Sequence, residues 1–195
     1  MSKVEKITLG SGDLHCIDDI SKIPTTIEEI KTLLTDDNFL GYISGGATLE
    51  YKPSFYEVKD DSGAVQKTII TEEEATLKSG VLTFNGKTLD KLCDTGRVTE
   101  TANERVVKIG GTANRKGKYY MIIFKYSDAV DGDSYVIIVG QNQAGFSLAY
   151  AKDKETVIDA EFKAKPMDKE GTLITYIEEI KATTEPTEQT EPVES

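Results

Sequence analysis

The stretch that decides the fold is YYMIIFKYSDAVDGDSYVIIV, residues 119–139. Residues 121–124 and 135–139 are apolar at every position, and the segment between them contains Asp131, Gly132 and Asp133. An Asp-Gly pair between two strand-like runs is a strong hairpin signal. Because neighbouring side chains of a strand point to opposite faces, consecutive apolar positions require cover on both faces. We therefore predict a central antiparallel hairpin with a helix or a second sheet on each side.

Strand patterns continue along the chain on both sides of this hairpin. Alternating apolar and polar residues, bounded by turns that contain Gly or Asp, predict strands at residues 3–9, 13–17, 47–59, 65–71, 75–84, 106–109, 146–151, 156–163 and 172–178, with a turn at 60–63. Many short strands with regular turn signals are typical of packed antiparallel sheets. We expect a mainly β domain over residues 1–181, built from two packed sheets as a sandwich or half-barrel with one or two short flanking helices.

Two helices are expected to flank the sheets. Residues 26–34 place Ile27, Ile30, Leu33 and Leu34 on one helical face, and either Thr25 with Glu28 or Thr26 with Glu29 supplies a capping box. This helix should end near residues 36–38, and residues 22–40 form an insertion that packs on its own subunit or acts as an arm. A second helix of about two turns at residues 85–92 should bury Leu89 and Leu92.

The last segment has a different composition. Residues 182–195 consist largely of Thr, Glu and Pro and contain almost nothing to bury. Such composition is typical of disorder, so we expect residues 182–195 to be a disordered acidic tail.

The charge balance disfavours nucleic-acid binding. The formal net charge is -11 at pH 7, from 34 acidic and 23 basic side chains. Wrapping of nucleic acid needs Lys and Arg to neutralise phosphates. The same charge suits a surface that DNA passes without binding.

Cysteine usage and hydropathy suggest a reducing compartment and no membrane anchor. Cys16 and Cys93 are too few for a disulfide framework, and their separation is not a metal-ligand spacing. The lysines at residues 3 and 6 are not followed by an apolar run, and no later stretch has the length needed to span a bilayer. We expect neither a secretion signal nor an anchor.

Motifs for catalysis are weak. His15 and Cys16 are adjacent in a strand-like segment, so they point to opposite faces and cannot form a nucleophilic pair. Residues 86–88 imitate the end of a phosphate-binding loop, but the glycine required five residues earlier is replaced by Val81. A strand-to-helix turn explains these residues better.

An aspartate cluster is better explained as a turn than as a metal site. Asp128, Asp131 and Asp133 lack the ligand spacing and the distal glutamate of a helix-loop-helix calcium site. We expect no catalytic residue, no cofactor and no metal, and therefore no enzyme.

One stretch has the opposite charge from the rest of the chain. Residues 97–118 carry six basic side chains and two acidic ones, a net of +4, and we single out Arg97, Arg105, Arg115, Lys116 and Lys118 as candidate contacts between subunits. Two alternatives remain open: a solvated loop, or contact with an acidic partner surface such as another copy of the chain.

Several short segments carry a resemblance to a known family. Residues 38–53, NFLGYISGGATLEYKP, resemble the strand entry of tail tube proteins from long-tailed phages of Gram-positive hosts. The supporting segments come in the order expected of that family: residues 9–12 (LGSG), 78–85 (KSGVLTFN), 140–142 (GQN) and 145–148 (GFSL). The similar segments lie between about residues 7 and 178, and the helix at residues 26–34 departs from the family pattern.

The resemblance implies an assembly and a location. Tail tube proteins form hexameric rings whose inner sheets close into a continuous barrel, and the rings stack into a conduit for DNA ejection. The expected partners are therefore other copies of the chain, other tail proteins at the tube ends, and DNA that passes without specific binding. The expected location is the tail of the virion, with the host cytoplasm before assembly.

The strand at residues 156–163 supplies candidate residues for a lumen. Asp159 and Glu161 share one face, whereas Ile158, Ala160 and Phe162 share the other. A lumenal position and a solvated outer face both fit this pattern.

A different class of protein would share the fold. The alternative is a monomeric β-sandwich that binds carbohydrate or protein, which would present aromatic residues on an exposed patch. The absence of Trp from the chain weakens this alternative.

Overall fold

The computed structural model describes residues 11–59, 61 and 66–181, and these residues form a mainly β, antiparallel fold, as predicted. The main sheet contains seven strands: β1 (Gly12–Ile17), β2 (Phe39–Lys59), β3 (Gln66–Val81), β6 (Tyr120–Tyr126), β7 (Ser134–Asn142), β8 (Ile158–Lys165) and β9 (Thr175–Glu178). The second, small sheet contains β4 (Arg97–Glu100) and β5 (Arg105–Lys108). The helices are α1 (Ile27–Leu33), α2 (Gly86–Leu92) and a 3-10 turn at Thr112–Asn114.

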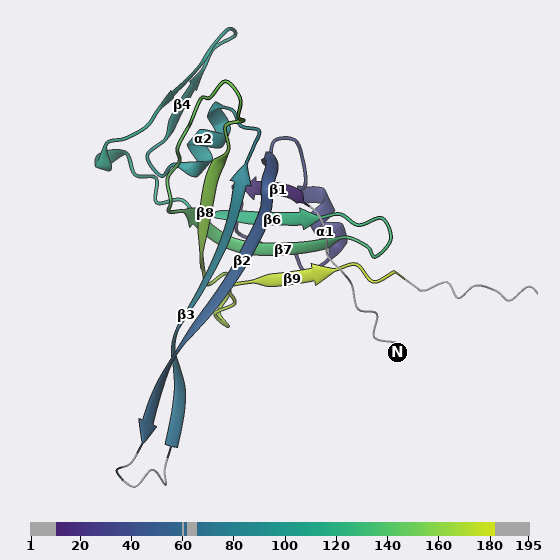
Figure 1. The fold of residues 1–195 in the computed structure, drawn as a ribbon, viewed down its shortest axis with the longest axis vertical. Helices are drawn as coiled ribbons and strands as arrows, with labels where there is room; N and C mark the ends of the chain where they lie inside the picture. The colour runs from purple at the N-terminus through teal and green to yellow at the C-terminus, as the bar shows by residue number, and fades with distance from the viewer. Residues whose placement is uncertain (1–10, 60, 62–65, 182–195) are drawn as a thin grey trace, which may run out of the picture.

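The predicted hairpin closes the main sheet. The strand order is β6-β1-β2-β3-β8-β7-β9, and β6 also pairs with β7, from Tyr120 opposite Gly140 to Tyr126 opposite Ser134. The other edge of β7 is shared, because its first half pairs with β9 and its last residues pair with β8. The packed sheets expected from the sequence thus take the form of one curled sheet that returns on itself (Figure 1).

Both faces of the central hairpin are buried, as its apolar runs require. One set of side chains, including Ile122 and Ile138, packs inside the curled sheet with Leu14, Leu77 and Phe162. The alternate set packs against α1 on the outside; it comprises Met121, Ile123, Tyr135, Ile137 and Val139. The chain therefore has two cores that share the walls β6 and β7.

Helix α1 packs on the body of its own chain. The Thr26 side chain caps it by accepting a hydrogen bond from the Glu29 amide at 3.2 Å, which confirms one of the two predicted caps. Ile30 is fully buried in the outer core. The helix ends at Leu33 rather than near residues 36–38, since Asn38 Nδ2 donates a hydrogen bond at 2.9 Å to the Leu33 carbonyl and turns the chain towards β2.

Helix α2 matches the prediction and sits over one end of the inner core. The Asn85 side chain accepts hydrogen bonds from the amides of Lys87 and Thr88, and the Thr88 hydroxyl returns one to the Asn85 amide. Leu92 is buried, and Leu89 packs against the same core. Residues 86–88 therefore form the predicted strand-to-helix turn.

Three strand predictions were wrong. Residues 65–71 and 75–84 belong to one strand, β3, because pairing with β2 continues through the acidic segment at residues 72–74. Residues 146–151 form no strand: Phe146 and Leu148 pack on the inner core from a loop, and no described strand pairs with this segment. Strand β4 was missed. The strand predicted at residues 3–9, most of the turn at 60–63 and the tail at 182–195 lie outside the described residues.

The contact between α1 and the sheet can be measured through Ile30. Ile30→Ala should lower the free energy of unfolding by about 2–4 kcal/mol, because it removes buried methyl groups from the outer core and leaves a cavity. Urea unfolding at pH 7 measures the change, with the exposed Lys31→Ala as control. A loss below about 0.5 kcal/mol for Ile30→Ala, similar to that expected for a surface position, would show that α1 does not hold the body together.

Candidate interaction surfaces

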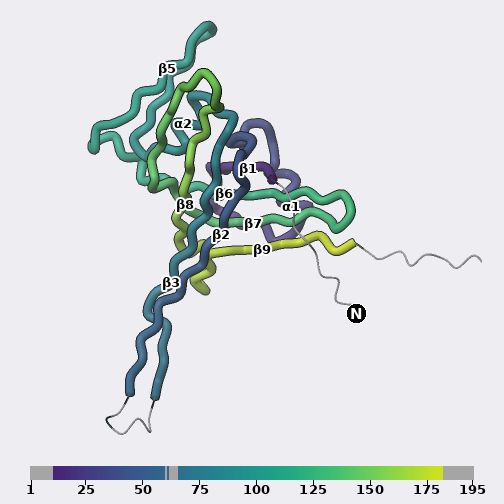
Figure 2. The backbone as a smooth tube through the Cα atoms, in the orientation of Figure 1, coloured from purple at the N-terminus to yellow at the C-terminus, as the bar shows by residue number. Residues whose placement is uncertain are grey.

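Strands β2 and β3 continue together far beyond the closed sheet. Pairing of β3 with β8 ends at Thr76, and residues 51–59 and 66–75 run on as a two-stranded ribbon, here called the arm. The arm projects from one end of the molecule (Figures 1 and 2). Among the described residues, no third strand or helix pairs with it.

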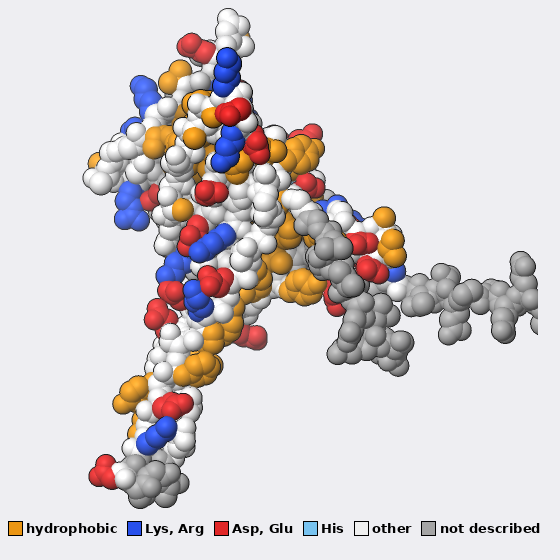
Figure 3. Space-filling view, in the orientation of Figure 1, with side chains coloured by type: hydrophobic (Ala, Val, Ile, Leu, Met, Phe, Trp, Pro, Cys, Tyr) orange, Lys and Arg blue, Asp and Glu red, His pale blue; other side chains and the backbone are white. Residues whose placement is uncertain are grey.

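Apolar side chains cover both faces of the arm. Phe55 pairs with Ile70 on one face, and Tyr56 pairs with Ile69 on the other. Phe55, Tyr56 and Ile70 are 59%, 57% and 54% exposed. Hydrophobic side chains gather along the arm in the space-filling view (Figure 3). A two-stranded hairpin alone is only marginally stable in water, and a large exposed apolar surface usually marks an interaction site. Within the described residues, no further strand or helix covers these side chains of the arm.

The predicted acidic pair lies on the outward face of β8. Ile158, Ala160 and Phe162 are buried inside, and Asp159 and Glu161 point away from the inner core, which confirms the alternation. Glu161 lies 3.6 Å from Lys78 Nζ on β3. Both acids line an open hollow of about 350 Å³.

A bulge in β2 shapes the rim of this hollow. Ser44 pairs with Gly80 and Ala47 pairs with Ser79, so Gly45 and Gly46 are extra residues in β2. Their φ angles of 78° and 80° are positive, which only glycine adopts without strain. The bulge therefore depends on these two glycines.

The basic stretch is largely neutralised within the chain. Four of its five candidate contacts have carboxylate partners, in the pairs Arg105–Glu100, Arg115–Asp94, Lys116–Asp90 and Lys118–Asp18, at 2.7–2.8 Å. Three of these carboxylates lie outside residues 97–118, which is why the sequence window overstated the free positive charge. The fifth, Arg97, donates instead to the Gly110 carbonyl at 3.3 Å.

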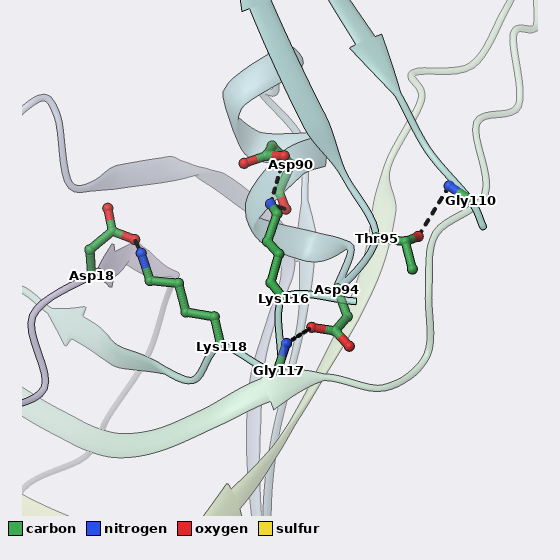
Figure 4. Close-up of polar contacts among 8 residues, drawn as sticks. All are labelled: Asp18, Asp90, Asp94, Thr95, Gly110, Lys116, Gly117 and Lys118. Carbon is green, nitrogen blue, oxygen red and sulfur yellow. Dashed lines mark hydrogen bonds and ion pairs between the residues drawn. The ribbon is translucent and has the colours of Figure 1, made fainter. Parts of the chain in front are cut away.

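These contacts close the base of a long excursion that carries β4 and β5. Asp94 Oδ1 accepts from the Gly117 amide at 2.8 Å, and Thr95 Oγ1 accepts from the Gly110 amide at 3.1 Å (Figure 4). The hydrogen bond from Arg115 is the main reason why the pKa of Asp94 is below its ordinary value. Sequence reasoning missed this set of contacts; the local signal was the presence of Asp90 and Asp94 shortly before the basic stretch.

The residues considered for catalysis are separated as expected. Cys16 is buried in the inner core, and burial raises the pKa of its thiol to about 12. His15 packs on the opposite face against Phe39, with ring centroids 5.4 Å apart, and desolvation lowers its pKa. Burial also raises the pKa of the Cys93 thiol.

Within residues 11–59, 61 and 66–181, neither a metal site nor a membrane-spanning helix is found. No group of three or more His, Cys, Asp or Glu side chains is placed to hold a metal ion. No helix in this part of the chain is long and apolar enough to cross a membrane. The loop with Asp128, Asp131 and Asp133 is the predicted hairpin turn, in which Asp128 Oδ1 accepts from two backbone amides at 2.8 Å.

No family model matches the chain, and no curated protein is significantly similar to it.

The contacts of Asp94 predict a pH-dependent contribution to stability. The folded-state pKa of Asp94 is lower than its ordinary 3.8, so its contribution is complete above about pH 4 and is lost as the pH falls below that value. Asp94→Asn should therefore lower the free energy of unfolding by roughly 1 kcal/mol at pH 7, since it weakens a charge-assisted hydrogen bond. Urea unfolding at several pH values measures the loss.

The exposed Asp153→Asn serves as control for the Asp94 variant. Limited proteolysis of residues 95–110 should also become faster in Asp94→Asn alone. Equal stability and equal cleavage in the two variants would show that Asp94 does not hold the base of the excursion.

Proposed function

We propose that the chain is a structural protein that assembles with copies of itself into hexameric rings, and that the rings stack into the tail tube of a long-tailed phage. The tube serves as the conduit for DNA ejection, in the virion tail, after assembly in the host cytoplasm. Other tail proteins cap its ends. The chain works without catalysis or a cofactor, and DNA passes it without specific binding.

The observation that carries this proposal is the arm. Covering a large apolar side chain contributes roughly 1.5–3 kcal/mol, so four such residues at two faces can supply much of the free energy of a subunit contact. Because Phe55 and Tyr56 point to opposite faces, one flat partner surface cannot cover both. Insertion between subunits covers both, as an assembly of many copies allows.

The charge of the chain supports the conduit. Acidic side chains outnumber basic ones by 34 to 23, so the chain as a whole repels DNA phosphates. The outward face of β8 presents Asp159 and Glu161, and a lumen lined by such acids repels phosphates. The resemblance of residues 38–53, 140–142 and 145–148 to tail tube proteins points the same way.

The most direct test is the size and shape of the purified protein. Sedimentation over a range of concentrations should show growth beyond the monomer, and electron microscopy should show rings or hollow tubes. A protein that stays monomeric at every concentration and salt would contradict self-assembly and favour the alternative of a monomeric binding module.

The role of the arm predicts the effect of one cross-strand pair. Phe55→Ser with Ile70→Ser should reduce the assembled fraction at least tenfold, because it removes the apolar contact from one face. The fold should change little, since both side chains are exposed. Sedimentation measures assembly, and circular dichroism measures unfolding.

A matched control lies four residues further along the same face. Lys59→Ser with Gln66→Ser alters an exposed cross-strand pair but leaves the apolar pair in place. This control should retain more assembly than the apolar variant. If the apolar variant assembles like the wild type, the arm is not an assembly element.

A lumenal position for the acidic pair predicts a defect in ejection. Asp159→Lys with Glu161→Lys should leave the subunit folded and tubes forming, but every ring would then present lysines that bind phosphates. Particles with this change should eject DNA more slowly, and high salt should restore much of the rate.

The same charge change at a loop provides the control for ejection. Asp153→Lys with Glu155→Lys replaces two exposed acids with the same spacing, outside β8. This control should eject normally. Unchanged ejection by the Asp159 and Glu161 variant would place these acids outside the lumen.

A further inference from the structure

The small sheet presents a second uncovered ribbon face. In the β4–β5 pair, Arg97 lies opposite Lys108 and Thr99 lies opposite Val106, so these four side chains share one face. All four are exposed. The other face, with Val107 and Arg105, lies against α2, where a Cβ on Gly86 would come within 2.7 Å of both side chains.

The exposed face of β4–β5 carries an unfavourable pair of charges. Like charges directly opposite each other in a sheet repel. Among the described residues, Arg97 and Lys108 are the two basic side chains of residues 97–118 that have no carboxylate partner. Val106, 41% exposed, lies beside them. A partner that supplies a carboxylate next to an apolar group would relieve both defects.

The arm offers this combination on one of its faces. Phe55 pairs with Ile70, and two residues further along β2, on the same face, lies Glu57. On β5 the same spacing of two separates Val106 from Lys108. The arm thus presents an exposed apolar group two residues from an acid, and β5 presents an exposed apolar group two residues from a base. The two patterns are complementary at equal spacing. Glu57 also lies 3.4 Å from Lys59, but such an exposed ion pair is weak and can be exchanged.

The two ribbons lie at opposite ends of the molecule. The arm projects from one end of the longest axis, and β4–β5 lies at the other (Figures 1 and 2). The arm therefore cannot reach β4–β5 of its own chain. Two different surfaces at opposite ends produce a heterologous, head-to-tail contact.

We propose that the face of β4–β5 formed by Arg97, Thr99, Val106 and Lys108 is the docking site for the Phe55, Glu57 and Ile70 face of the arm of a second copy. This inference rests on the proposed self-assembly and names the surface by which one copy receives the next. Nucleic acid fits the site less well, because two unpaired cations beside an exposed valine, on a chain of net charge -11, provide little phosphate binding.

Charge exchange tests the contact. Arg97→Glu with Lys108→Glu places acids on the receiving face, where they repel Glu57 of the arm. The variant keeps a like-charge pair in the sheet, so its free energy of unfolding should be similar to that of the wild type. This variant should raise the concentration required for assembly at least tenfold, as should Glu57→Lys. Combining all three changes should bring that concentration back to within about threefold of the wild-type value.

Lys152→Glu with Lys154→Glu is the control for the loss of two exposed bases. This control should assemble normally. Thermal unfolding by circular dichroism shows whether each variant remains folded, and only folded variants are compared.

Mixing two blocked variants tests the head-to-tail geometry. The variant with Arg97→Glu and Lys108→Glu retains a working arm, and the variant with Phe55→Ser and Ile70→Ser retains a working receiving face. At a concentration at which neither variant assembles alone, a 1:1 mixture should form a species of twice the monomer mass. Arm-to-arm contact would instead let the first variant associate by itself, and that result overturns the inference.

Other outcomes separate this inference from the proposed function. If the wild type and the Arg97 and Lys108 variant assemble equally while the arm variant does not, self-assembly stands but the receiving face is wrong. If the reversal leaves assembly unchanged and abolishes binding of duplex DNA seen with the wild type, the face is a nucleic-acid site. A wild type that never assembles refutes the proposed function itself.

Discussion

Backbone hydrogen bonding between β6 and β7 is the contact on which the rest of the structure depends. A sheet with open edges exposes unpaired amides and carbonyls, and pairing of β6 with β7 removes those edges by closing the sheet on itself. Closure also creates an inside, filled by Leu14, Leu77 and Phe162, and gives α1 an outer wall to cover. The apolar runs on both strands are the direct consequence, because each strand has two buried faces.

Closure determines which surfaces remain for function. Within the described residues, the body has few free strand edges, and the ribbons that extend beyond it are the arm and the β4–β5 pair. In each ribbon the two strands pair only with each other, and at least one face is uncovered. On that face, each ribbon lacks the packing that a strand normally receives from neighbouring elements. The proposals of self-assembly and of arm docking follow from this difference between a closed, well-packed body and ribbons with uncovered faces.

The net charge of a sequence window overstates the positive charge that remains free in the folded chain. Residues 97–118 are a basic window, but Asp18, Asp90 and Asp94 approach three of its cations from other parts of the chain. Most of these cations therefore form ion pairs within the chain, and they hold the base of the excursion closed. What remains is the cross-strand pair of Arg97 and Lys108, a much smaller and more specific feature.

The sequence by itself determined the local features: a helix cap at Thr25 or Thr26, of which Thr26 forms, a helix start near residue 85, the hairpin turn at residues 128–133, and the alternation that buries Ile158 and exposes Asp159. These depend on side chains within a few residues of one another, so their physics is complete within a short window. Residues 146–151 have a strand pattern but form no strand, because a strand also needs a neighbour to pair with, and no described strand pairs with them. Tertiary structure alone decided the sheet closure, the isolation of the arm and the ion pairs. Lys118 meets Asp18 across 100 positions, and no local pattern records which of many acids a given lysine will meet when the chain folds.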